Sequence, residues 1–299
     1  MRANIPCYGK SLTNETSISF IWPITMQRLV SISAIEKKFE TSGSRPILVL
    51  AEDLEHYICK YPHFSNDSRL VNEYLGNRFA QIWGISVPEM AFVQVKRQHI
   101  PEHMLGNNLN YFNLEKPLVG FKLIADVTEF MDTLSEGIGS SDLLKYEKKE
   151  FLLIALFDMW LSNDDRNTNN TNILIKSEDN KIVPVAIDHE KIFNTGSLDH
   201  DIYEQTYVDS IFYSNLYHRL FKNSQSTVEL IHEVCATLHE KVSECNDQLD
   251  GILDEIPYEW NIDIKELKEK LGRNIFQESW LNKVEATFRN FASLAIKNP

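Results

Sequence analysis

The sequence has few cysteines and no long apolar run, and both shortages limit what the protein can be. Its four cysteines, Cys7, Cys59, Cys235 and Cys245, include no pair at CxxC spacing. They therefore indicate neither a zinc site nor a disulfide framework, and a reducing cytoplasm fits them best. The N-terminal stretch MRANIPCYGKSLTNETS has no apolar core of signal-peptide length, and no segment is apolar enough to span a membrane. We expect a soluble cytoplasmic protein without a membrane partner.

Positive charge is also scarce. The 299 residues include 30 lysines and arginines against 43 aspartates and glutamates, which gives a formal net charge of −13. A nucleic acid backbone or an anionic membrane would meet net repulsion, so we expect no binding of nucleic acid by the chain itself. Any anionic ligand must be held by a local group of cations or by a metal ion.

The spacing of the apolar residues changes along the chain, from mostly strand-like to mostly helix-like, and so indicates two parts. The first part predicts strands over 46–51, 56–61 and 91–95, with a helix over 69–83 that stops at Gly84. After the apolar stretch 117–124 the pattern is mostly helical, except for residues 172–188, which predict two short strands joined by a polar turn.

Two further patterns predict helices in the second part. Ser226 followed by Glu229 has the spacing of a capping box and predicts the start of a long helix that reaches about Leu253. More helices are expected after Pro257. Together these elements predict an α+β, bilobal fold with a β-rich N-terminal lobe, residues 1–118, and a mostly helical C-terminal lobe, residues 119–299.

The stretch SNDDRNTNNTNILI, residues 162–175, concentrates oxygen ligands between an apolar helix and an apolar strand. A calcium loop starting at Asp165 is excluded, because the sixth position is Asn170 instead of glycine and the twelfth is Lys176 instead of glutamate. Phosphoryl transfer explains the residues better. Asp165 would orient the acceptor hydroxyl and take its proton, while Asn170 and Asp188, which ends the next strand, would bind Mg²⁺. A simple polar turn is the plainer alternative for any one of these residues.

A nucleotide also needs a cation from the β-rich part. Lys60 lies in the strand-like run HYICKYP, and Glu73 lies in the helix that follows, which is the arrangement of a phosphate-binding lysine held by a helix glutamate. The alternative is a solvated lysine and a solvated glutamate. Upstream, Ser42, Gly43 and Ser44 could bring backbone N–H groups close to phosphates, although the stretch lacks a GxGxxG pattern and is also typical of an ordinary turn.

The segments SGSRPIL, YICKYP, NEYLGNRFAQIWGISVPE, FDMWLSNDDRNTNNTNILI, VAIDHEKIF and IPYEW resemble the bacterial HipA-like kinases, in particular the shorter group with a stand-alone kinase domain. The resemblance covers about residues 42–260. It implies a protein-kinase-like fold related to lipid kinases, ATP and Mg²⁺ as cofactors, and a toxin–antitoxin context. It further implies Asp165 as the catalytic base, Asn170 and Asp188 as Mg²⁺ ligands and Lys60 as the lysine that contacts ATP. No stretch resembles the extra N-terminal subdomain of the toxin, and Asn167 stands where several relatives have His or Thr.

Three functions remain open from the sequence. The leading one is an ATP- and Mg²⁺-dependent kinase that phosphorylates a protein on serine or threonine, with an unknown regulatory partner. The second is a small-molecule kinase of the antibiotic-phosphotransferase type, which shares the Asp, Asn and Ile-Asp pattern but has His before the catalytic Asp. The third is a nucleotide-binding scaffold without catalysis. Such a scaffold is expected to lack at least one acidic or Asn ligand, and all of them are present, which disfavours this function.

Overall fold

The computed structural model describes residues 25–40, 44–63, 68–106, 109–194, 196, 198–222 and 224–297. Its β-rich part is a six-stranded sheet with the order β1-β5-β6-β4-β3-β2, in which the β1–β5 pair is parallel and the other pairs are antiparallel. The strands are β1 (Arg28–Val30), β2 (Lys37–Lys38), β3 (Ile47–Leu50), β4 (His56–Lys60), β5 (Met90–Gln94) and β6 (Leu118–Lys122). The strands predicted over 46–51, 56–61 and 91–95 are present as β3, β4 and β5. The predicted lobe boundary between residues 118 and 119 falls within β6.

Helix α1 (Ser68–Trp83) lies against this sheet and ends at Gly84, whose φ of 76° is the left-handed conformation that glycine adopts readily. One hydrophobic core joins α1 to the helical part of the chain. A smaller core, which includes Ile47, Val49 and Val93, covers the other face of the sheet. Burial alternates along β3, where Ile47 and Val49 face the smaller core and Leu48 and Leu50 are half-buried.

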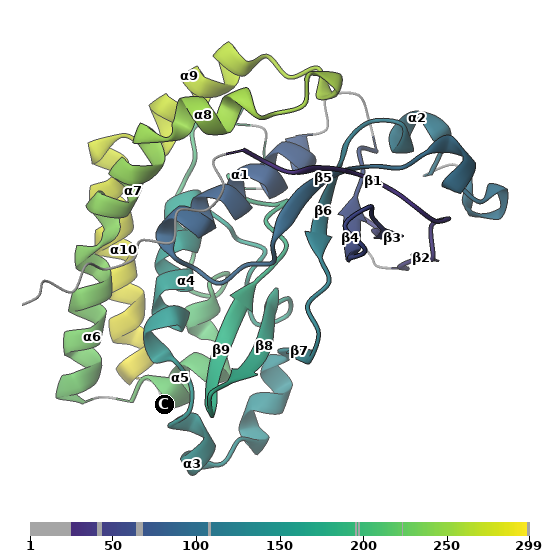
Figure 1. Ribbon diagram of the computed structural model, residues 1–299. Coiled ribbons are helices and arrows are strands. Elements are labelled where there is room, and N and C mark those ends of the chain that lie inside the picture. The colour runs from purple at the N-terminus through teal and green to yellow at the C-terminus, as the bar shows by residue number, and fades with distance from the viewer. Residues whose placement is uncertain are drawn as a thin grey trace, which may run out of the picture.

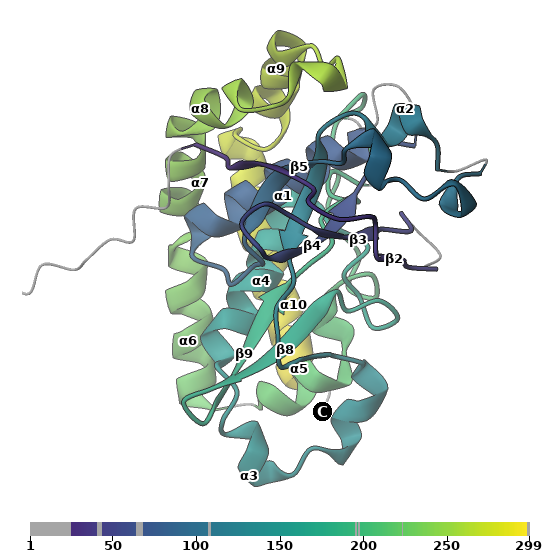
Figure 2. The same cartoon turned by 45° about the vertical axis from the view of Figure 1, so that its right-hand side comes forward.

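The helical part surrounds the central helix α4 (Lys148–Leu161), which is buried along most of its length and packs against α6 and α10 (Figure 1). A three-stranded sheet, β7-β8-β9, lies beside α4 and below the first sheet (Figures 1 and 2). The remaining elements are β7 (Val127–Glu129), β8 (Ile173–Glu178), β9 (Lys181–Ala186), α2 (Tyr111–Leu114), α3 (Ser140–Leu143), α5 (Asn215–Leu220), α6 (Gln225–Ala236), α7 (Leu238–Asp247), α8 (Leu249–Asp254), α9 (Ile264–Asn274) and α10 (Glu278–Lys297), with 3₁₀ turns at Arg97–His99, Glu102–Met104, Asp132–Gly137, Ile211–Tyr213 and Tyr258–Trp260.

The prediction of one long helix opened by Ser226 and Glu229 is wrong in two respects. The N-cap is Ser224, whose hydroxyl oxygen accepts a hydrogen bond from the backbone N–H of Thr227, while Glu229 accepts one from Gln225 instead of closing a capping box. The helix is also divided into α6, α7 and α8. At the first division the Thr237 N–H and hydroxyl both bond to the Val234 carbonyl, which tightens the turn.

Within the described part of the chain, no helix is long and apolar enough to cross a membrane.

Candidate active site

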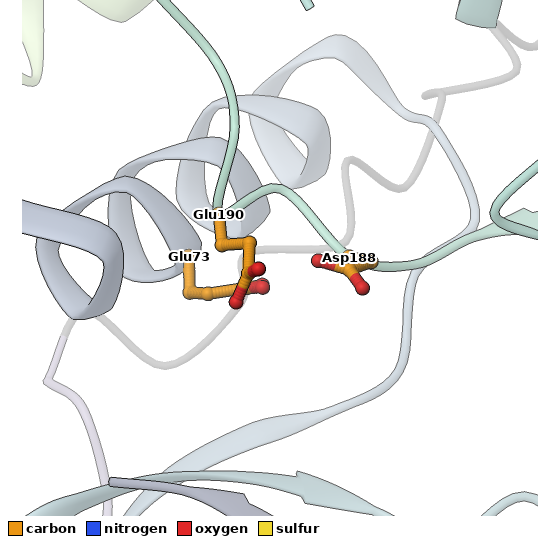
Figure 3. Close-up of side chains that lie close together, drawn as sticks. All are labelled: Glu73, Asp188 and Glu190. Carbon is orange, nitrogen blue, oxygen red and sulfur yellow. The ribbon is translucent and has the colours of Figure 1, made fainter. Parts of the chain in front are cut away.

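The first half of the site is a group of three carboxylates around one ammonium ion. Lys60, at the end of β4, contacts Glu73 of α1 and lies 2.9 Å from Asp188 Oδ1 and 3.8 Å from Glu190 Oε2. Figure 3 shows Glu73 projecting from α1, and Asp188 and Glu190 projecting from the loop after β9 into the same space. The structure thus brings together Lys60, Glu73 and Asp188, which are far apart in the sequence.

Burial and charge act against each other in this group. Burial alone would lower the pKa of Lys60, but Glu73, Asp188 and Glu190 together raise it above its ordinary value. Burial would raise the pKa of Asp188, and Lys60 more than reverses this, so the pKa of Asp188 is lowered. The result is a protonated lysine held beside an ionised aspartate at neutral pH.

Helix α1 also fixes the loop that carries Asp188. Asn72 Nδ2 donates hydrogen bonds to the carbonyl oxygens of Glu190 and Gly196 at 3.0 and 3.2 Å. Glu73 Oε2 accepts one from the His189 backbone N–H at 3.1 Å. Gly76 allows the closest approach, because a Cβ atom at this position would lie 2.4 Å from His189 Cβ.

His189 itself is a packing residue with a neutral ring. It is 1% exposed and lies edge-on to Phe157, with 6.0 Å between the ring centroids. Burial, with a smaller contribution from Arg166, lowers its pKa well below 6.5. A neutral imidazole here adds no charge beside Asp188.

The second half of the site is the loop after α4. The helix ends at Ser162, which has a left-handed backbone conformation (φ 49°). Arg166 is fully buried and contacts Asp158 of α4, and it donates further bonds to the carbonyl oxygens of Ile187 at 2.8 Å and Asn172 at 3.4 Å. Arg166 therefore ties the loop to α4 and to the residue that precedes Asp188.

Asp165 lies on the same loop with its carboxylate held on both oxygens. Oδ2 accepts hydrogen bonds from the side-chain amides of Asn170 at 2.9 Å and Asn172 at 3.3 Å, and Oδ1 lies 3.1 Å from Lys191 Nζ. The side-chain amide nitrogen of Asn170 is directed to Asp165. The side-chain oxygen Oδ1 of Asn170 is therefore left for another partner.

The β8–β9 hairpin brings the two loops together. Ile173 pairs with Ala186, and the Ile187 N–H donates a 3.0 Å hydrogen bond to the Asn172 carbonyl. Because the loop with Asp165 and Asn170 precedes β8 and Asp188 follows β9, the hairpin holds their backbones at one end of the sheet. The two strands and the polar turn between them were predicted from the sequence.

Of the predicted phosphate loop, Ser42 and Gly43 lie outside the described residues. Ser44 is described and buried, and it lines a small hollow together with Lys60, Glu73 and Glu190. Among the described residues of this predicted loop, Ser44 therefore lies beside Lys60.

The donor atoms suit a magnesium ion. Mg²⁺ prefers hard oxygen ligands, and Asp188 offers a carboxylate while Asn170 offers the amide oxygen that its bond to Asp165 leaves over. The metal role of Asn170 and Asp188 stays a prediction.

The sequence interpretation missed five residues of the site: Asn72, Asp158, Asn172, Glu190 and Lys191. One of them left a signal, because Asp158 is a charged residue inside the apolar run LIALFDMWL and so requires a buried partner. Asn172, Glu190 and Lys191 lie within three residues of predicted site residues but depend on the folded loops for their contacts.

The fold is protein-kinase-like. A structure of the Helicobacter pylori proinflammatory kinase CtkA is similar to the chain with a TM-score of 0.50 and 15% identity, over 91% of this chain and 98% of that one. Weaker similarities are to the Golgi casein kinase with Mn/ADP bound (TM-score 0.42, 10% identity, 85% and 74% of the two chains) and to Shewanella oneidensis MR-1 HipA in its complex with HipB and operator DNA (TM-score 0.40, 13%, 89% and 70%). Comparison with curated protein sequences gave no match.

The family model of the HipA-like kinases matches residues 32–290. The chain belongs to this family, as the resemblance of its motifs implied, and it has the expected α+β kinase fold.

Proposed function

We propose that the protein is an ATP- and Mg²⁺-dependent kinase that transfers the γ-phosphoryl group of ATP to a serine or threonine of a protein. The observation that supports this best is the 2.9 Å contact between Lys60 Nζ and Asp188 Oδ1, which joins a strand of the first sheet to the loop after β9. A phosphate-binding lysine and a metal-binding aspartate must act on the same triphosphate, so their side chains must meet.

Each residue of the site has its own role in the proposed reaction. Lys60, oriented by Glu73, binds phosphate oxygens of ATP. Asp165 accepts the proton of the acceptor hydroxyl, and the amides of Asn170 and Asn172 keep its carboxylate in place. Asn170 and Asp188 would hold Mg²⁺, which would supply positive charge to offset the charge that develops on the phosphates.

The direct test is phosphoryl transfer from labelled ATP to the protein itself or to proteins of a lysate, with Mg²⁺ present. The Asp165→Ala variant should lose about 10²–10⁴-fold in rate, which is the usual contribution of a positioned general base. Asp254→Ala, which changes an exposed aspartate at the end of α8, is the matched control and should keep the wild-type rate.

Titration of ATP with Mg²⁺ separates binding from chemistry. Asp188→Asn should weaken binding, whereas Asp165→Ala should bind nearly as well as wild type. A wild-type protein that neither binds ATP with Mg²⁺ nor transfers phosphate would refute the proposal. Labelling of cationic sugars without labelling of protein would replace the proposed acceptor by a small molecule.

A further inference from the structure

Lys191 is a cation of the site that the proposed roles leave unused. Its Nζ lies 3.1 Å from Asp165 Oδ1, and its side chain is 44% exposed. It stands three residues after Asp188, on the same loop. Asp165 is less exposed, at 19%, so the pair lies at the mouth of the site with the lysine on the solvent side.

The two oxygens of Asp165 are in different situations. Oδ2 already accepts from the amides of Asn170 and Asn172, whereas the contact of Oδ1 is with Lys191. An acceptor hydroxyl that gives its proton to Asp165 therefore meets Oδ1, and it meets Lys191 there as well. The transferred phosphoryl group passes between the hydroxyl and the nucleotide, so it also comes close to this ammonium group.

The neighbouring cations are committed to other partners. Lys60 is 8% exposed and contacts three carboxylates. Arg166 is fully buried and bound to Asp158 and two carbonyl oxygens. A buried side chain with several bonds cannot follow a group that moves during transfer. Lys191 has one carboxylate contact and a flexible, half-exposed stem, so it can.

We propose that Lys191 is a catalytic residue that contacts the transferring phosphoryl group, an inference that rests on the proposed kinase function. Before substrate binds, its ammonium group pairs with Asp165. During transfer, the acceptor oxygen forms a bond to the γ-phosphorus while the bond from that phosphorus to the bridging oxygen of ATP breaks, and its electron pair leaves with ADP. Asp165 takes the hydroxyl proton, and Lys191 stabilises the charge on the equatorial phosphoryl oxygens.

The loop explains why this residue suits the task. Asp188 and Lys191 share a short segment that α1 holds through Asn72, Glu73 and Gly76. The ammonium group is thus positioned by the same structure that positions the metal ligand. Contact with Asp165 also raises the pKa of Lys191, so it stays protonated at neutral pH.

The test compares Lys191→Met, which removes the charge and keeps the length, with Lys191→Arg, which keeps the charge. Lys176→Met is the matched control, since Lys176 of β8 is similarly exposed (40%) and has one carboxylate partner, Glu178 at 3.3 Å. We expect Lys191→Met to lower kcat about 10²–10³-fold, with the KM for ATP changed less than threefold. The kcat of Lys191→Arg should be at least tenfold higher than that of Lys191→Met. Lys176→Met should keep the wild-type kcat.

A binding measurement gives a readout that a structural role would not move. ADP, Mg²⁺ and aluminium fluoride together imitate the transferring phosphoryl group, so wild type should bind them more tightly than ADP with Mg²⁺ alone. Lys191→Met should lose at least tenfold of this gain and keep its affinity for ADP with Mg²⁺. Equal gains in Lys191→Met and wild type, or a kcat within threefold of wild type, would overturn the role of Lys191 and leave the kinase function intact. Failure of wild type to bind ADP with Mg²⁺ would refute the kinase function and the inference with it.

Discussion

Replacement of Gly76 by alanine tests the close contact between α1 and the loop that carries Asp188. The new Cβ atom would lie 2.4 Å from His189 Cβ and 2.8 Å from His189 Cγ. Ordinary contacts of this kind are longer by about 1 Å, so either the helix or the loop must move. His189 Cβ is attached directly to the backbone, and the His189 N–H is bonded to Glu73, so a rotamer change cannot relieve the overlap.

The magnitude follows from two opposing effects. Overpacking of a filled interior costs about 1–3 kcal/mol, and the short distance places this site near the upper end. Alanine in place of glycine inside a helix contributes about 1 kcal/mol in the other direction. We therefore expect Gly76→Ala to lower the free energy of unfolding by about 2 kcal/mol, measured by urea denaturation with the protein free of ligand.

Two further variants make the test specific. Gly272→Ala changes a glycine inside α9 whose added Cβ would meet open space, so it should gain up to about 1 kcal/mol. His189→Gly removes the atom that Gly76→Ala strikes, so the double variant should be more stable than the sum of the two single losses by about 1–2 kcal/mol. A Gly76→Ala protein as stable as Gly272→Ala, or fully additive losses, would show that the helix and the loop are not packed this closely.

Two other predictions concern buried charges near the site. Arg166→Met should cost about 3–5 kcal/mol of stability, because it leaves the Asp158 carboxylate buried without its cation; adding Asp158→Asn should recover part of this loss in urea denaturation, and an equal loss with and without that change would contradict the reasoning. Burial lowers the pKa of His189 in the folded state, so the neutral ring contributes stability that is present above the unfolded pKa of about 6.5 and lost as the pH falls below it. The stability of wild type should therefore fall by up to about 1.4 kcal/mol per pH unit more steeply than that of His189→Asn between about pH 6.5 and 5, and parallel curves would show that folding does not lower the pKa of His189.

Much of the fold was predictable because its elements have strong local signals. The sequences of β3, β4 and β5 either alternate between apolar and polar residues or are continuously apolar. Helix α1 ends before a glycine in the left-handed conformation, and β8 and β9 flank a polar turn. Asp165 and Asn170 precede a predicted hairpin, and Asp188 follows it. Because the two ends of a hairpin lie side by side, the sequence could suggest that these candidate residues belong to one site. Lys60 and Glu73 follow from their places on a strand and on the next helix.

The rest depends on contacts that no local pattern records. Asn72 and Gly76 look like ordinary helix residues, and their role appears only when the loop after Asp188 lies against them. Lys191 is a lysine among many until its ammonium group lies beside Asp165. The error at Ser226 has a local cause. Ser224 and Ser226 both precede apolar residues and both can cap, so the spacing to Glu229 favoured the wrong one.

Helix α1 has polar contacts with both parts of the molecule. Toward the helical part, Tyr74 donates to the Ile252 carbonyl at 2.8 Å, and Arg78 lies 3.6 Å from Glu255. Asn72 and Glu73 bind the loop after β9 in addition.

On the side of the first sheet, Glu73 contacts Lys60 of β4, and Tyr74 packs against Phe92 of β5 with 5.4 Å between the ring centroids. A displacement of the sheet relative to the helices would therefore separate Lys60 from a group of carboxylates that α1 and the loop keep together. Because Lys60 also binds Asp188 directly, such a displacement breaks the link between the proposed phosphate-binding lysine and the proposed metal ligand in one step.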